Sequence, residues 1–307
     1  MGRVLFIFLD GVGIGSRDPD SNPFFQADLP TLSSLLGGRT PHLDLPESVQ
    51  GDCVAFPLDP VLGVEGLPQS GTGHTALLTG ENGPALYGRH FGPWVPVRLR
   101  PLVKERNVLT RAQAEGHRCA FANAYPKEFH GSPWARRPAG PLLAAVAAGL
   151  LTREAEALGR GEALSSEIVN SAWRKRLGYT DLPEITPFEA GRNLARITER
   201  VDFTFFAHYA TDYVGHRGEM PDAVRALERV DTFLAGILEE LPPDTLLVVT
   251  SDHGNLEDIT RGHTLNPVLT LLKGPKAQSL REGKTRITDI PNLILAALSM
   301  GKDRESA

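Results

Sequence analysis

Residues 245–255 read Thr-Leu-Leu-Val-Val-Thr-Ser-Asp-His-Gly-Asn, an apolar and β-branched run that leads into a cluster of polar side chains. A continuous run of this composition predicts a strand that is buried on both faces. Asp252 and His253 would then stand at its carboxyl end, where open α/β sheets place their binding sites. His263 follows ten residues after His253. Taken alone, this cluster could be a cap and a loop hydrogen bond, so its meaning depends on the rest of the chain.

Two segments near the N-terminus show the same pattern. The wholly apolar strand predicted for residues 4–9 leads into Asp10 and then into Gly-Val-Gly-Ile-Gly over 11–15. Ser70 lies in the glycine-rich stretch 68–74, directly before residues with helical character. Gly-Val-Gly-Ile-Gly could suggest a dinucleotide loop, but it does not match the G-x-G-x-x-G spacing that such loops need.

A further strand is predicted for residues 203–207, and polar residues follow it too. Asp212 and His216 are four residues apart, so one helical turn or a compact loop can direct both side chains to one ion. The four segments together supply six nitrogen or oxygen metal ligands and one hydroxyl that could act as a nucleophile. The set comprises Asp10, Ser70, Asp212, His216, Asp252, His253 and His263.

This combination of residue types favours phosphoryl-transfer chemistry. Carboxylates mixed with imidazoles suit two divalent ions such as Mn²⁺ or Zn²⁺, because Ca²⁺ and Mg²⁺ prefer all-oxygen cages. Two ions can clamp the attacking and the leaving oxygen of an in-line displacement. Coordination would also acidify the hydroxyl of Ser70, which is otherwise a poor nucleophile. The start of a helix after Ser70 favours a phosphate, because its N–H groups and its dipole attract anions.

The order of the motifs resembles that of the alkaline-phosphatase superfamily. Asp10 comes first, then Ser-Gly-Thr-Gly-His over 70–74, Asp-x-x-x-His over 212–216, Asp-His-Gly-Asn over 252–255 and His-Thr-Leu-Asn-Pro over 263–267. Within the superfamily, the chain is most similar to the branch that holds cofactor-independent phosphoglycerate mutase and phosphopentomutase. The resemblance implies an α/β fold of three layers, α/β/α, with a largely parallel sheet.

The resemblance also implies how two divalent ions would be held. The first ion would be bound by Asp212, His216 and His263, and the second by Asp10, Asp252, His253 and the oxygen of Ser70. Ser70 would then become a transient phosphoserine, and the partner would be a small phosphorylated substrate.

Each of these residues also has a simpler interpretation. Asp10 could be a turn residue, and Ser70 could be a helix N-cap, which is the commonest role for a serine there. Asp212 and His216 could form a surface pair, and His263 could face solvent from a loop. Four segments in the expected order, each with the required residue types, favour the joint interpretation.

Three further residues are candidates with less support. Arg217 and Arg261 stand in the sequence close to His216 and His263, and a guanidinium can clamp phosphate oxygens. An exposed arginine in a surface ion pair is at least an equal alternative for each. His74 could support a metal ligand from behind, or it could be a packed core histidine.

The strand and helix pattern predicts the main elements of the fold. Strands are expected over 4–9, 119–122, 203–208, 245–250 and 268–272, and helices over 99–115, 141–151, 188–200 and 221–241. Residues 288–298 resemble the last helix of the superfamily branch, so the resemblance implies a helix there. Residues 46–67 are interpreted as a loop because they are rich in Pro, Gly and Asp.

The interval 80–201 departs from the mutase branch. Mutases of that branch carry a sizeable second domain here, which closes over the substrate. Once the expected helices and strand are set aside, only 126–187 remains, which is too little for an independent cap with its own core. We therefore expect residues 1–307 to form a single domain, with 126–187 as at most a reduced cap or insertion.

The missing cap bears on the reaction. A mutase must keep water away from its phosphoserine, which is the task of a lid. The sequence therefore favours a two-metal phosphohydrolase, a phosphatase or a phosphodiesterase. A phosphomutase is the alternative, and a catalytically silent metal-binding or nucleotide-binding regulatory protein is a third interpretation that the complete ligand set disfavours.

Composition is that of an ordinary globular protein. The chain has 307 residues, of which 41% are hydrophobic and 22% charged, and its net charge is −5. Without a basic stripe, nucleic acid is not an expected partner. Without a stretch of ~20 apolar residues, a membrane span is not expected either. The apolar run 4–9 is too short for a signal peptide, so the cytoplasm is the expected location. The sequence does not predict an oligomeric state.

Overall fold

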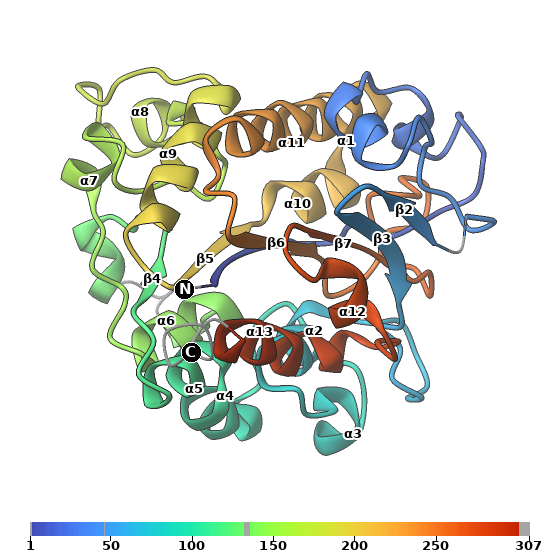
Figure 1. Ribbon diagram of the computed structural model, residues 1–307, viewed down its shortest axis with the longest axis horizontal. Coiled ribbons are helices and arrows are strands. Elements are labelled where there is room, and N and C mark those ends of the chain that lie inside the picture. The colour runs from blue at the N-terminus through green and yellow to red at the C-terminus, as the bar shows by residue number, and fades with distance from the viewer. Residues whose placement is uncertain (1, 46, 132–135, 301–307) are drawn as a thin grey trace.

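The computed structural model describes residues 2–45, 47–131 and 136–300 of the chain. A seven-stranded sheet in the order β2-β3-β7-β6-β1-β5-β4 runs through the molecule, and helices cover both of its faces (Figure 1). The predicted three-layer α/β/α architecture is therefore confirmed. In sheet order the strands are Ser48–Gln50, Cys53–Leu58, Val268–Lys273, Thr245–Thr250, Arg3–Leu9, Phe203–His208 and Cys119–Phe121.

Strand β1 is the strand around which the two cores are built. Its side chains alternate, so that Phe6 and Phe8 enter the core on one face, while Ile7 and Leu9 enter the core on the other. All four are buried. A strand buried on both faces needs an unbroken apolar sequence, which is what residues 4–9 show.

The helices divide between the two faces of the sheet. The layer that shares a core with Phe6 and Phe8 contains α2 (Ser70–Thr79), α4 (Arg100–Arg106), α5 (Val108–Ala114), α6 (Gly140–Ala147) and α13 (Ile290–Ser299). The opposite layer contains α1 (Pro30–Leu35), α9 (Pro187–Glu199) and α11 (Met220–Glu240). The remaining α-helices are α3 (Gly83–Tyr87), α7 (Ala155–Gly159), α8 (Ser171–Lys175), α10 (Ala210–Arg217) and α12 (Ala277–Arg281). Short 3-10 helices span Pro23–Phe25, Val97–Leu99, Lys127–Gly131 and Ile287–Asp289.

The parallel centre of the sheet brings three predicted segments together at the carboxyl ends of its strands. Strands β6, β1 and β5 are parallel neighbours, with Leu9 opposite His208 and Phe8 opposite Thr250. Their carboxyl ends therefore lie side by side. The residues that follow these strands, from Asp10, from Ser251 and from Tyr209 onward, emerge at the same edge, as expected for the site of an open α/β sheet.

Strand β7 runs antiparallel to β6, so only part of the sheet is parallel. A parallel return would need a crossover connection, usually a helix. Residues 251–267 form turns and isolated bridges instead of a helix, and they carry Asp252, His253 and His263. The chain therefore reverses directly into β7.

The prediction of a loop over residues 46–67 is wrong in part, because β2 and β3 lie within it. The strand signal of β3 is weakened by Pro57, which cannot donate a hydrogen bond to a ladder. Strand β2 pairs only with Cys53 to Ala55, so Pro57 lies where β3 has β7 as its one paired neighbour. A proline is tolerated at such an edge.

The helix predicted for 99–115 is interrupted at Asn107, which ends α4 and begins α5. The buried Asn107 side chain accepts hydrogen bonds from the N–H groups of Leu109 and Thr110, at 3.0 and 3.1 Å. Asparagine is a strong N-cap residue, and here its capping bond is preferred to helix continuation.

Residues 126–187 do not behave as one unit, and 132–135 lie outside the described residues. Helix α6 packs against α2, α4 and α5 in the main core. Leu164 and Ile168 belong to the core on the opposite face of the sheet. Other residues of this stretch contribute to a small apolar cluster centred on Leu158, Trp173 and Leu182. That the whole chain forms a single domain stays a prediction.

In the described part of the chain, no helix is both long enough and apolar enough to cross a lipid bilayer.

Candidate metal centre

Three of the predicted ligands meet at the exposed side of the site. The Nε2 atoms of His216 and His263 lie 2.9 Å apart, and each lies 3.5 Å from Oδ1 of Asp212. Asp212 and His216 stand one turn apart on α10, and His263 comes from the loop before β7. This is the triad that the superfamily resemblance assigns to the first ion.

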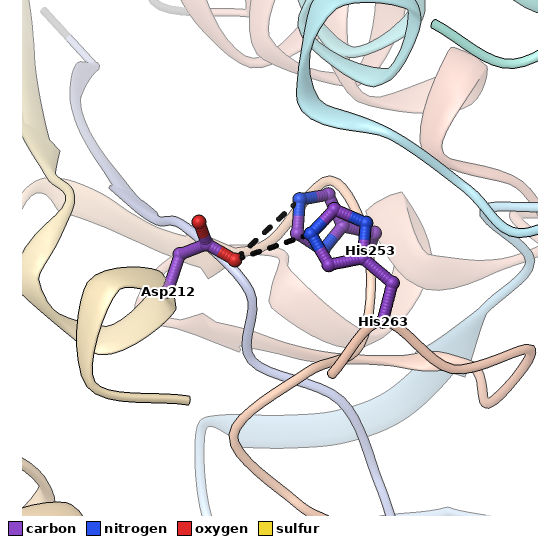
Figure 2. Close-up of side chains that lie close together, drawn as sticks. All are labelled: Asp212, His253 and His263. Atoms are coloured by element: carbon purple, nitrogen blue, oxygen red, sulfur yellow. Dashed lines mark ion pairs between the residues drawn. The ribbon is translucent and has the colours of Figure 1, made fainter. Parts of the chain in front are cut away.

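The remaining predicted residues converge on His253. Its Nε2 atom lies 3.4 Å from Oδ1 of Asp10, 3.5 Å from Oδ2 of Asp252 and 3.0 Å from Oγ of Ser70. It also lies 3.9 Å from Oδ1 of Asp212, so the two groups adjoin. Figure 2 shows Asp212, on α10, facing both His253 and His263.

The structure thus brings all seven predicted residues into one place. Two sets of side chains have ligand atoms within 4.8 Å of one another and could each hold a metal ion: Asp10, Asp252 and His253 form one, and Asp212, His253 and His263 form the other. Because His253 belongs to both sets, two ions bound here would be close neighbours.

The carboxylates of Asp10 and Asp252, on the buried side of the site, need a compensating positive charge. Asp252 is fully buried and Asp10 nearly so. Burial, together with neighbouring carboxylates, raises the pKa of both well above the ordinary value. Among the described residues, Oδ1 of Asp10 and both carboxylate oxygens of Asp252 have no hydrogen-bond partner. Buried carboxylates without donors are costly unless a cation compensates them, so the residues present fit a metal site.

Asp212 differs from these two because donors surround it. Burial alone would raise its pKa, but the hydrogen bond with His263, the adjoining His253 ring and the hydrogen bond from Asn255 together lower the pKa of Asp212 well below its ordinary value. The Nδ2 group of Asn255 donates to Oδ1 of Asp212 at 2.6 Å. Asp212 is therefore held as a carboxylate, the form that a metal binds.

The two histidines nearest the centre present Nε2 to it. Nδ1 of His263 lies 2.7 Å from the carbonyl oxygen of Pro68, and Nδ1 of His253 lies 3.3 Å from that of Gly254. A carbonyl oxygen only accepts, so in each ring Nδ1 carries the hydrogen and Nε2 keeps its lone pair in the neutral form. Burial lowers the pKa of His253 to about 3, so this ring is neutral at pH 7. Both rings are thus oriented as metal-ligating histidines are.

His74 supports the carboxylates from behind. Its Nδ1 accepts a hydrogen bond from the N–H group of Gly140 at 3.2 Å, so the hydrogen of the neutral ring is on Nε2. Nε2 faces Oδ2 of Asp252 at 3.4 Å and Oδ2 of Asp10 at 3.6 Å. The sequence left open whether His74 supports a metal ligand or is a packed core histidine. Its position beside Asp10 and Asp252 favours the supporting role.

Glu257 is a buried residue at the site that the sequence analysis missed. Its carboxylate accepts hydrogen bonds from the N–H groups of Gly13 (3.1 Å) and Asn255 (2.7 Å), from the hydroxyl of Thr264, and from Nδ2 of Asn266 (3.1 Å). These donors belong to the loops that carry Asp10, His253 and His263. The one sequence signal was a glutamate two residues after the end of the Asp-His-Gly-Asn motif, and no general spacing rule assigns such a residue a role.

Two glycines allow the loops to pack this closely. Gly11 has φ +71°, and a Cβ atom there would lie 2.8 Å from Oδ1 of Asp212. A Cβ atom on Gly13 would collide with the carboxyl group of Glu257. A side chain at either position would displace a residue that shapes the centre.

The two arginines proposed for phosphate binding lie apart from these contacts. Arg217 stacks over the ring of Tyr213, with 5.2 Å between the guanidinium carbon and the ring centre. Arg261 is exposed and forms an ion pair with Asp258, Nε to Oδ2 at 3.2 Å. In the described part of the chain, no hydrogen bond or ion pair joins either one to the predicted ligands. A role in substrate binding stays a prediction for both.

Comparison with known proteins connects this geometry to a superfamily. A family model described as the Metalloenzyme superfamily matches residues 178–302. The 2,3-bisphosphoglycerate-independent phosphoglycerate mutase of Ruegeria pomeroyi is 38% identical over 104 residues, which are 31% of this chain and 20% of the relative. That of Vesicomyosocius okutanii is 31% identical over 139 residues, 41% of this chain and 27% of the relative. The matched part thus spans only 20% to 27% of these curated relatives.

Solved structures resemble the chain over nearly its whole length. A protein from Pyrococcus horikoshii aligns over 97% of both chains with a TM-score of 0.57 and 14% identity. The alkaline phosphatase from the Antarctic bacterium TAB5 aligns over 97% of both chains with a TM-score of 0.50 and 13% identity. These likenesses establish the fold, and with the family match they confirm the predicted resemblance to the alkaline-phosphatase superfamily.

Proposed function

We propose that this alkaline-phosphatase-like chain is a metal-dependent phosphoryl-transfer enzyme that hydrolyses a small phosphate ester through a phosphoserine at Ser70. The observation that carries the proposal is the position of Ser70 Oγ, 3.0 Å from Nε2 of His253, where the two groups of candidate ligands adjoin. A role as a helix cap alone would not explain why Ser70 lies where the two groups of candidate ligands adjoin.

The residues present would hold two divalent ions, Mn²⁺ or Zn²⁺. Asp212, His216 and His263 would hold one, and Asp10, Asp252, His253 and the Ser70 oxygen would hold the other. When bound, the ions would offset the charges of the carboxylates and of the incoming phosphate and would acidify the Ser70 hydroxyl. The mixed nitrogen and oxygen donor set supports Mn²⁺ or Zn²⁺ over Ca²⁺.

The start of helix α2 would orient the phosphate. Ser70 is the first residue of this ten-residue helix, so its N–H group and that of Gly71 have no acceptor within the helix. The N–H groups of Thr72 and Gly73 are already bonded, to the carbonyl oxygens of Phe91 and Gln69 at 2.9 and 2.8 Å. The first two N–H groups therefore remain for phosphate oxygens.

The reaction would proceed in two displacements. In the first, the Ser70 oxygen bonds to phosphorus, the ester bond breaks, and the alcohol leaves with a proton. In the second, water bonds to phosphorus, and the bond to Ser70 breaks to give inorganic phosphate and restore the hydroxyl. His74, Asn255 and Glu257 take no part in bond changes and hold the candidate ligands in place.

Hydrolysis is favoured over mutase chemistry by what surrounds the site. The His216 side chain is 42% exposed, so water reaches this side of the centre. Within residues 126–187, α6 is part of one main core and Leu164 and Ile168 are part of the other. The one separate apolar cluster that the described remainder adds is the small one around Leu158, Trp173 and Leu182. A lid able to hold a dephosphorylated intermediate would need a larger folded unit.

A phosphomutase is the second candidate, because the curated relatives named above are phosphoglycerate mutases. The distinction lies in the fate of the phosphoryl group. A hydrolase transfers it to water, whereas a mutase returns it to another hydroxyl of the same substrate. In either case a small phosphorylated molecule is a better substrate than a nucleic acid, because the net charge is −5.

The test measures inorganic phosphate released from a panel of small phosphate esters by protein loaded with Mn²⁺ or Zn²⁺. Ser70→Ala should abolish release, whereas Ser279→Ala, which changes a serine on α12, should leave it unchanged. The same mixtures are followed by ³¹P NMR. A rearranged ester without free phosphate would replace the hydrolase proposal with the mutase. Two bound metals with neither product would leave a metal-binding protein without this activity.

A further inference from the structure

A polar cavity lies against helix α10, outside the set of candidate metal ligands. It has a volume of about 430 Å³ and is lined by parts of α8, α10 and α11 together with the end of β5. Ligand pockets in proteins typically measure about 300–1,000 Å³, so the space suits a small organic molecule.

Arginine dominates the lining of this cavity. Arg176, Arg217, Arg225 and Arg229 all border it, against two acidic residues, Glu167 and Asp222. Four guanidinium groups around one cavity are notable in a chain whose net charge is −5. The cavity therefore has a local positive excess that an anion would neutralise.

Among the described residues, two of these arginines have no carboxylate partner. Arg225 forms an ion pair with Asp222, and Arg176 approaches Glu167 at 3.9 Å. Neither Arg217 nor Arg229 forms an ion pair with any carboxylate among the described residues. Their donors are therefore available, and a guanidinium binds carboxylate or phosphate oxygens in a bidentate manner.

The cavity adjoins the metal centre through one helix. On α10, Asp212 and His216 are one turn apart and belong to the centre, whereas Tyr213 and Arg217 are one turn apart and line the cavity. Successive helical residues differ by about 100°, so the two pairs occupy adjacent faces of the same helix. The arginine cavity is thus a neighbour of the centre but is built from other side chains.

We propose that this cavity binds a small organic anion, a carboxylate or a phosphate, through the guanidinium groups of Arg217 and Arg229. His208, which also lines it, is neutral at pH 7 and adds no charge of its own: Nδ1 faces the carbonyl oxygen of Ser166 at 2.7 Å, and burial lowers the pKa of the ring to about 4. The proposal does not depend on whether phosphoryl transfer occurs at the metal centre.

The test observes the two guanidinium groups directly by ¹H–¹⁵N NMR of their Nε–H signals. Zn²⁺-loaded protein is titrated separately with inorganic phosphate and with succinate, because paramagnetic Mn²⁺ would broaden the spectra. Arg217→Lys and Arg229→Lys assign the signals by their loss and keep the charge, so that folding is preserved. Arg106 is the matched control. It lies on helix α4, in the other helical layer, and its Nη1 atom is 3.0 Å from Oε1 of Glu81.

Saturable shifts of the Arg217 and Arg229 signals, with a flat Arg106 signal, are the expected result. In each lysine variant, the apparent affinity reported by the remaining arginine should fall more than tenfold. Saturation by both anions, or by only one of them, supports the cavity and defines its ligand class. Shifts that rise linearly and equally at all three arginines would show ionic-strength effects alone and overturn the proposal.

Discussion

The Nε2 atom of His216, on helix α10, lies 2.9 Å from the Nε2 atom of His263, in the loop before β7. Because Nδ1 of His263 donates to the carbonyl oxygen of Pro68, its Nε2 carries a lone pair in the neutral ring. The two nitrogens converge with Oδ1 of Asp212, at 3.5 Å from each. Such a cluster is best satisfied by a shared cation.

Removing one of these nitrogens should empty one site and spare the other. The wild-type chain should retain about two divalent ions after dialysis, and His263→Ala about one, because only one triad loses a ligand. Elemental analysis of the dialysed protein gives the ratio. His90→Ala, which changes a histidine bonded to the carbonyl oxygen of Val64, is the control and should retain both ions. Full retention by His263→Ala would remove this residue from the ligand set.

Chelation should destabilise the whole fold. Asp10 and Asp252 are buried with unpartnered oxygens, so loss of the ions leaves each group either with an uncompensated charge or with a proton, which its raised pKa favours. We expect a loss of about 3–5 kcal/mol in unfolding free energy, the usual cost of leaving a buried charge unpaired. Differential scanning calorimetry before and after EDTA, with recovery on adding Mn²⁺ or Zn²⁺, measures the effect. An unchanged melting temperature would argue against occupied sites.

Gly11→Ala should impair the centre beyond its effect on stability. Ala at a positive φ costs about 1 kcal/mol, and here its Cβ would also lie 2.8 Å from Oδ1 of Asp212. Gly51 is the matched control, because its φ is +59° and a Cβ atom there would have no neighbour within 4 Å. Both variants should lose similar backbone stability, but only Gly11→Ala should weaken metal affinity, by at least about tenfold. Calorimetric metal titration compares them, and equal affinities would contradict the expectation.

Glu257→Gln should loosen three loops at once. The amide keeps the size of the side chain, but its NH₂ group would meet donors where the carboxylate accepted from them. We expect a loss of about 2–4 kcal/mol in a urea unfolding experiment, since hydrogen bonds to a buried charged group are lost. Glu199→Gln, at the exposed end of α9, should be neutral. Metal affinity should fall along with stability only in the first variant.

Much of the fold could be predicted because its strands are continuous apolar runs. Strands β5 and β6 span the predicted residues, and α9 and α11 begin and end within one residue of the prediction. Strand β3 and the break between α4 and α5 were not predicted, because in each case a local sequence preference conflicted with the longer-range pattern. Pro57 masked β3, which its pairing with β7 stabilises, and Asn107 interrupted a helix whose apolar period continued.

The residues of the candidate site were predicted from strand ends, and the structure brings all seven together. Their role as ligands stays a prediction. Asn255 and Glu257 were missed as supports because their importance arises from contacts between loops that are distant in sequence, such as the bond from Gly13 to Glu257. No spacing rule within one segment reports a partner 244 residues away.

The position of β1 has a consequence for how the chain is made. Val4 pairs with Phe203 on one side and with Leu246 on the other, so both neighbours are synthesised long after it. Until then, a wholly apolar strand with two unpaired edges remains exposed to other chains, which is a recognised route to aggregation. Native pairing of this kind has high contact order and is slow. We therefore expect the nascent protein to depend on chaperones until residue 250 has left the ribosome, since the centre of the sheet cannot close earlier.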